Sequence, residues 1–132
     1  MDTRRYKVLV VDDDPDIREI VASFLASEGH DCDLAKDGAE ALDKTNAGRF
    51  DAIITDFSMP RMNGVALASE LLKQNRSFPV IIMTGSIDEG TTEKIVSAGV
   101  SDLLYKPFSM SELGARFERM MRKHEALQAS AG

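Results

Sequence analysis

Residues 7–17 read KVLVVDDDPDI, and this stretch decides the fold. Its first five residues are almost continuously Val and Leu, which is typical of a strand buried on both faces of a parallel sheet. Three acids follow, and then Pro15, whose fixed φ suits the first turn of a helix. From there to Gly29, apolar residues recur at helical spacing, namely Ile17, Ile20, Val21, Phe24 and Leu25. The stretch therefore predicts a buried strand, an acidic turn, and a helix over about residues 15–28.

The same alternation continues along the chain. AIIT at 52–55 and VIIM at 80–83 repeat the buried-strand pattern, and DLLY at 102–105 predicts a short fifth strand. At 31–34, Cys32 and Leu34 alternate with Asp31 and Asp33, which indicates a half-exposed strand at an edge. Helical patterns cover about 39–47, 65–75, 89–98, and from about 109 onward. Because parallel strands need helical crossovers, the sequence predicts an α/β fold with helices on both faces of one open sheet.

Length, charge and cysteine content restrict the class of protein. The 132 residues are enough for one domain, so we expect a single domain over residues 1–132. No apolar run is long enough for a membrane helix or a targeting segment, and the single Cys32 excludes an internal disulfide or a Cys-based zinc site. A net charge of -6, from 22 acids and 16 Lys plus Arg, argues against direct nucleic-acid binding. These features favour a soluble cytoplasmic protein with no membrane partner.

Polar side chains follow four of the predicted strands where each strand ends. They are Asp12 and Asp13, Asp56, Thr84 and Lys106. Because the carboxyl ends of parallel strands meet at one edge of the sheet, we expect these groups to converge. An Asp after a strand also fits a helix cap or a turn, Thr84 alone fits a strand-end hydroxyl, and Lys106 alone fits a surface lysine. Their conjunction, however, indicates a site.

The three acids of this set imply a cation. Two carboxylates about 4 Å apart repel by roughly 4 kcal/mol at an effective dielectric near 20, so three need compensation. Oxygen ligands without nearby His or Cys favour Mg2+, held by Asp12, Asp13 and Asp56. The arrangement then suits phosphoryl transfer to a carboxylate, with Asp56 as nucleophile and with Thr84 and Lys106 binding two phosphoryl oxygens.

Four motifs in order resemble the receiver domain of two-component response regulators: VVDDDPD at 10–16, TDFSMPRMNG at 55–64, MTG at 83–85 and YKPF at 105–108. The resemblance covers about residues 6–121, which leaves 122–132 as a helix end and tail. It implies a flavodoxin-like five-stranded parallel sheet in the order 2-1-3-4-5, flanked by five helices. It also implies that Asp56 is the phosphoacceptor, that the backbone carbonyl of Ser58 is a further Mg2+ ligand, and that Pro107 follows a cis peptide.

The resemblance implies partners as well. The phosphodonor would be a phosphohistidine on a sensor histidine kinase or a histidine phosphotransfer protein. The output would be conformational switching that controls a downstream protein docked on the fourth helix, fifth strand and fifth helix, or a phosphorylation-dependent homodimer. Because no stretch of domain size follows the predicted core, we expect a receiver without an attached effector domain.

One position departs from the family pattern. The family's switch residues include the hydroxyl that Thr84 matches and an aromatic residue three positions before the lysine, and that position is Leu103 here. Tyr105 lies directly before Lys106, on the same side of the strand as Leu103 unless a bulge intervenes. We therefore predict that switching relies on the loop at 85–90 and on the fourth helix.

Two other functions stay open. A metal-dependent phosphatase of the haloacid dehalogenase type also uses an aspartyl nucleophile, but it needs a second Asp two residues later, where this chain has Ser58. A constitutive pseudo-receiver scaffold would not need the complete acid, hydroxyl and lysine set. For the tail after Arg122, a frayed end is favoured over a dimer contact or a linker helix.

Overall fold

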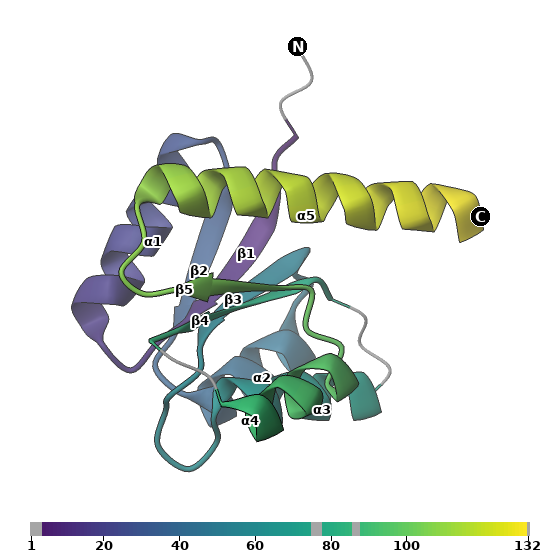
Figure 1. Cartoon of the computed structure of the whole chain (residues 1–132). Coiled ribbons are helices and arrows are strands. Elements are labelled where there is room, and N and C mark those ends of the chain that lie inside the picture. Colours follow the sequence, from purple (N-terminus) through teal and green to yellow (C-terminus); the bar gives the residue numbers. More distant parts are fainter. Residues whose placement is uncertain (1–3, 75–77, 86–87, 132) are drawn as a thin grey trace.

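The computed structural model describes residues 4–74, 78–85 and 88–131. In this part of the chain five strands alternate with five helices (Figure 1). Their bounds are β1 Lys7–Val11, α1 Pro15–Ser27, β2 Asp31–Ala35, α2 Gly38–Ala47, β3 Ala52–Asp56, α3 Gly64–Lys73, β4 Val80–Thr84, α4 Glu89–Ser97, β5 Asp102–Tyr105 and α5 Met110–Ala131. The predicted alternation is therefore confirmed, and apart from the end of α5 the predicted bounds agree with the observed ones or differ by one or two residues.

The five strands form one parallel sheet in the order β2-β1-β3-β4-β5. Val8 pairs in register with Cys32 on one side and with Ala52 on the other, so β1 lies inside the sheet. All five residues of β3 and of β4 are buried, as their apolar runs predict. β2 is only partly buried and lies at an edge, in agreement with its alternating pattern.

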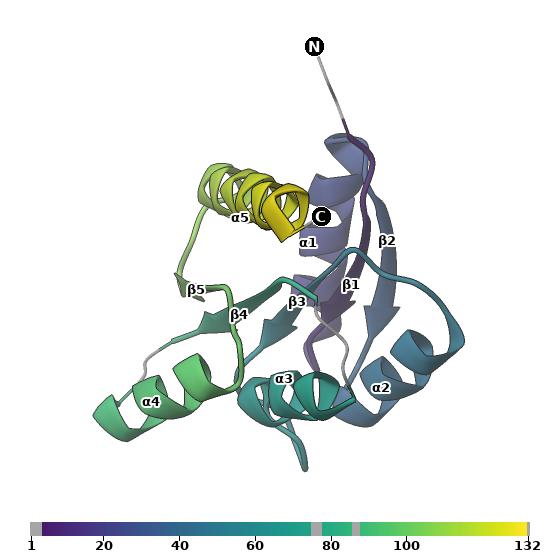
Figure 2. The ribbon, with the colours of Figure 1, turned by 90° about the vertical axis from the view of Figure 1, so that its right-hand side faces the viewer.

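Helices cover both faces of the sheet. α1 and α5 lie together on one face, and α2, α3 and α4 lie on the other (Figures 1 and 2). Alternate residues of β1 serve the two faces: Val8 and Val10 pack in the core beneath α1 and α5, whereas Leu9 and Val11 pack in the second core. This arrangement leaves the carboxyl ends of the strands as the edge at which polar side chains gather.

Side-chain caps determine where four helices begin. Asp14, Asp37, Asn63 and Asp88 each accept a hydrogen bond from a backbone N–H in the first turn of α1, α2, α3 and α4 respectively. Such caps satisfy amide groups that have no partner inside the helix. Gly29 after α1 has a φ of 94°, which a residue with a Cβ rarely adopts. Among the acids before Pro15, Asp14 thus caps α1, whereas Asp12 and Asp13 belong to the candidate site.

The end of α5 differs from the prediction. A frayed tail was expected after Arg122, but the helix runs without interruption to Ala131. Glu125 explains the difference, because its carboxylate accepts a hydrogen bond from the Tyr6 hydroxyl and forms an ion pair with Arg4. Two residues from the other end of the chain thus hold the helix beyond the point where its apolar contacts with the sheet end.

None of the helices in the described ranges combines the length and the apolar character needed to cross a bilayer.

Candidate functional site

Three carboxylates meet where β1 and β3 end. These strands are neighbours, with Val11 in register with Thr55, so Asp12 and Asp56 follow at adjacent positions. Carboxylate oxygens of Asp12, Asp13 and Asp56 all lie within 4.8 Å of one another. Asp12 is 1% exposed and Asp56 is 6% exposed, whereas Asp13 lies at the surface. The predicted convergence of the three acids is confirmed.

Lys106 brings the positive charge of the site. Its Nζ donates to Asp56 Oδ1 at 3.0 Å, and its backbone N–H donates to the carbonyl oxygen of Thr84 at 2.7 Å. Thr84 is the last residue of β4 and is buried. Residues from β3, β4 and the β5–α5 loop are therefore tied together at one edge of the sheet.

The Asp12 carboxylate is destabilised in its charged form. Burial raises the pKa of Asp12 to about 6, and the Asp56 charge adds to the effect, although the bond from the Asp14 N–H opposes it. Asp12 Oδ2 is buried and has no hydrogen-bond partner among the described residues. A buried carboxylate oxygen without a donor costs free energy unless a cation or donor reaches it. The three-carboxylate set therefore fits a hard divalent cation such as Mg2+.

The loop between β3 and α3 approaches the nucleophile candidate closely. A Cβ on Gly64 would lie 2.6 Å from the carbonyl oxygen of Asp56, so no larger residue fits there without a shift of the backbone. The Gly64 N–H donates to the Phe57 carbonyl at 2.9 Å, which closes the loop on itself. Arg61 has a φ of 69°, and Ser58 is exposed on the same loop. The loop is therefore held near the acids by a backbone contact, together with the packing of its Phe57, Met59 and Met62 side chains against the core.

The predicted switch residues other than Thr84, namely Leu103, Tyr105 and Pro107, lie on and after β5. Ile82 pairs with Leu103 and Thr84 pairs with Tyr105 in one continuous register, so Leu103 and Tyr105 share a face without a bulge. Leu103 packs against the core, whereas Tyr105 is 52% exposed. The Lys106–Pro107 peptide is cis, as the resemblance implied. Of the predicted switching loop at 85–90, residues 86 and 87 lie outside the described residues.

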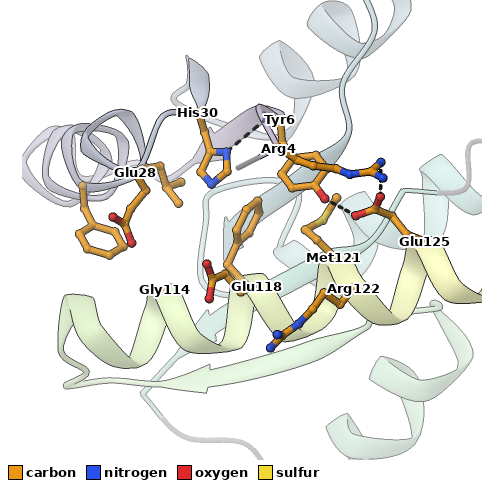
Figure 3. A pocket seen from close by; sticks show the side chains of 12 residues that line it. Arg4, Tyr6, Glu28, His30, Gly114, Glu118, Met121, Arg122 and Glu125 are labelled. Carbon is orange, nitrogen blue, oxygen red and sulfur yellow. Dashed lines mark hydrogen bonds and ion pairs between the residues drawn. The ribbon is translucent and has the colours of Figure 1, made fainter. Parts of the chain in front are cut away.

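A cavity of about 540 Å³ lies away from these acids, between α1 and α5 (Figure 3). Tyr6 and His30 lie at its wall, and the Tyr6 backbone N–H donates to His30 Nδ1 at 3.2 Å. Burial lowers the pKa of His30, while the charges of Glu28 and Glu118 oppose that shift. The sequence did not indicate this cluster, because its members come from three separate stretches of the chain.

Comparisons with known proteins agree with the geometry. The family model of the response regulator receiver domain matches residues 8–118. Response regulator MprA of Mycolicibacterium vanbaalenii is 35% identical over 119 residues, which is 89% of this chain and 51% of that protein. The chain thus spans about half the length of the curated relatives it matches.

Solved structures show the same fold. Chemotaxis protein CheY4 of Vibrio cholerae aligns with a TM-score of 0.83 and 32% identity, over 89% of this chain and 99% of that one. NtrX from Brucella abortus aligns with a TM-score of 0.87 and 30% identity, over 96% of this chain and 29% of that one. The matched family, the sheet order and the acidic edge agree, and the chain belongs to the response regulator receiver domain family.

Proposed function

We propose that the chain accepts a phosphoryl group on Asp56 from a phosphohistidine of a sensor histidine kinase or a histidine phosphotransfer protein. The observation that carries the proposal is the contact of Lys106 Nζ with Asp56 Oδ1 beside two further carboxylates. An ammonium at this place can stabilise the negative oxygens of an incoming phosphoryl group as well as the nucleophile. Family membership supports the same assignment.

In this reaction an Asp56 carboxylate oxygen attacks phosphorus and forms an acyl phosphate. The phosphorus–nitrogen bond to the donor imidazole breaks, and its electron pair stays on the imidazole nitrogen. Lys106 would then bind one phosphoryl oxygen, and the Thr84 hydroxyl would donate to another. Such a reaction depends on positioning and electrostatics more than on proton transfer.

Asp12, Asp13, Asp56 and the backbone carbonyl of Ser58 would hold Mg2+. When bound, the ion supplies charge compensation for the carboxylates and for the phosphoryl oxygens. Asp12 Oδ2, which has no hydrogen-bond partner among the described residues, supports this donor set, since a cation would compensate this buried carboxylate.

We further propose that phosphorylation changes the surface formed by α4, β5 and α5, where a downstream protein or a second copy would dock. Val96 on α4 is 73% exposed and Tyr105 on β5 is 52% exposed, so this surface carries apolar groups that a partner could cover. Because Leu103 replaces the aromatic switch, the loop at 85–90 and α4 would move while Tyr105 keeps its orientation. NMR spectra with and without a phosphoryl analogue test this, and a reoriented Tyr105 beside an unmoved loop contradicts it.

The central test is incubation with Mg2+ and acetyl phosphate, followed by intact mass. We expect one added phosphoryl group on the wild-type protein and on Asp43→Asn, which removes an exposed carboxylate of α2, but none on Asp56→Asn. Repeated turnover of phosphomonoesters would instead favour the phosphatase hypothesis. A wild-type protein that stays unmodified and binds its partners equally well would favour the constitutive scaffold.

A further inference from the structure

Arg18 reaches back from α1 to the acidic edge. It is half-buried, and its Nη1 donates to the backbone carbonyl oxygen of Asp12 at 2.6 Å. The Arg18 backbone N–H also donates to the carbonyl oxygen of Asp14 at 3.1 Å. The residues from 12 to 14 between β1 and α1 are thus tied to Arg18 at both ends.

Asp12 has four polar positions, and three of them have partners. Its N–H donates to the Ala35 carbonyl at 3.1 Å, its carbonyl accepts from Arg18, and its Oδ1 accepts from the Asp14 N–H at 2.9 Å. Only Oδ2 has no partner in the described part of the chain. The three bonds fix the direction in which this oxygen points, and Arg18 supplies the one bond that comes from a side chain of another element.

We propose that Arg18 is a positioning residue for Mg2+ binding, acting through the Asp12 carbonyl. This rests on the proposed function, since it assigns Asp12 to the magnesium site. Partners that orient a metal ligand commonly change metal affinity by tenfold to a hundredfold when they are removed. The guanidinium also repels a divalent cation, so loss of its charge alone would strengthen Mg2+ binding. The two effects have opposite signs and can be told apart.

The experiment measures the Mg2+ dissociation constant of the unphosphorylated protein by isothermal titration calorimetry. Arg18→Met removes both the donor and the charge, so a net fall in Mg2+ affinity, which we expect to reach about tenfold to a hundredfold, shows that lost positioning outweighs lost repulsion. Arg18→Lys keeps a donor and should recover part of the affinity. Arg49→Met removes an exposed arginine after α2, at the opposite end of β3, and should leave the affinity unchanged.

A purely structural role predicts a different result. The melting temperature of Arg18→Met in EDTA would fall, while the dissociation constant for Mg2+ would equal that of the wild type. Unchanged or tighter Mg2+ binding by a folded Arg18→Met, or by Arg18→Gln if the Met variant does not fold, overturns the proposal. A wild-type protein that binds no Mg2+ overturns the proposed magnesium site and this proposal together, whereas normal wild-type binding with an unaffected variant overturns only the role of Arg18.

Discussion

At the scale of single residues, Asp12 combines burial with a carboxylate oxygen, Oδ2, that no donor reaches within the described ranges of the chain. It is 1% exposed, and one of its carboxylate oxygens lies within 4.8 Å of carboxylate oxygens of Asp13 and Asp56. Burial of a charged carboxylate is unfavourable unless a cation or hydrogen bonds compensate it. The Asp12 carboxylate therefore lowers the free energy of unfolding of the metal-free protein. Such a cost is expected of a carboxylate that binds a ligand.

We predict that Asp12→Asn raises the free energy of unfolding of the metal-free protein at pH 8 by about 1–3 kcal/mol. The pKa of Asp12 is 3.8 in its ordinary state and is raised to about 6 in the folded protein. The folded protein therefore loses stability as the pH rises from the lower pKa through the higher one, and the full loss is present at pH 8. An Asn at this position keeps the acceptor for the Asp14 N–H and removes the charge. Urea denaturation in EDTA measures the change.

The matched control is Asp13→Asn, because Asp13 belongs to the same cluster but is exposed. Its gain in stability should be smaller than that of Asp12→Asn. An Asp12→Asn protein that is less stable than the wild type in EDTA would show that the carboxylate is not strained in the metal-free fold.

At the scale of elements, α5 depends on contacts from the start of the chain. The Glu125 carboxylate accepts a hydrogen bond from the Tyr6 hydroxyl and forms an ion pair with Arg4 (Figure 3). Glu125 lies in the part of the helix that continues past the buried Met121. Burial, together with the neighbouring Glu125, raises the pKa of Tyr6 to about 12, so the phenol stays protonated and can donate. The contact therefore persists over the physiological pH range.

We predict that Tyr6→Phe lowers the free energy of unfolding by about 1 kcal/mol, because Glu125 loses a donor at a partly buried position. Amide hydrogen exchange in residues 122–131 should become faster, since the end of α5 is held less firmly. Tyr105→Phe is the control, because Tyr105 is 52% exposed, and it should change neither quantity. Equal exchange rates in Tyr6→Phe and the wild type would mean that the contact does not hold the helix.

His30 gives the same junction a dependence on pH. Its Nδ1 accepts the Tyr6 N–H, so a proton on that nitrogen breaks the bond, and burial among Tyr6 and Phe117 disfavours the cation. A lowered pKa means that the unfolded chain takes up the proton first as the pH falls. Stability is therefore complete above about pH 6.5 and decreases below it.

We predict that this decrease is absent or smaller in His30→Gln, which keeps an acceptor near the Tyr6 N–H but does not titrate. Glu28 and Glu118 favour the imidazolium and limit the size of the effect. Thermal unfolding between pH 5 and 8 measures it, with His124→Gln on α5 as the control. A wild-type curve that keeps the same slope in His30→Gln would assign the pH dependence to other groups.

At the scale of the whole molecule, one sheet serves two cores. Leu9 and Ile53 point to the face covered by α2, α3 and α4, whereas Val10 and Ile54 point to the face covered by α1 and α5. Because both cores share β1 and β3, loss of packing on either face weakens the same strands that end in the acidic site. Folding and the geometry of the site are thus coupled through the central strands.

We predict that Leu9→Ala lowers the free energy of unfolding by about 3 kcal/mol, since it opens a cavity at a position with 0% exposure. Unfolding should stay a single transition, because the core on the other face depends on the same strand. Val96→Ala is the control, being 73% exposed on α4, and should change stability little. Two separate transitions in Leu9→Ala would mean that the two faces unfold independently.

The amino-acid sequence by itself determined the alternation of strands and helices and the residues of the acidic edge. Buried parallel strands are continuous apolar runs, and their carboxyl ends lie at one edge, so Asp12, Asp13, Asp56 and Lys106 could be placed together from their positions alone. That β1 and β3 are neighbours was implied by the family resemblance, and the pairing of Val11 with Thr55 confirms it. Apolar runs and the polar residues that follow them are patterns of neighbouring residues, so they can be recognised in the sequence alone.

Only the tertiary structure decided the contacts between distant residues. Tyr6 and Glu125 are 119 positions apart, and no periodic pattern in the sequence marks their contact, which is why the end of α5 was predicted to fray. The bond from Arg18 to the Asp12 carbonyl and the approach of Gly64 to the Asp56 carbonyl depend on backbone positions that the packing of helices on the sheet determines. The hydrophobic pattern predicts the helices and strands because burial recurs with the period of each element. Single polar contacts cannot be predicted in this way, because they depend on the relative positions of the packed elements.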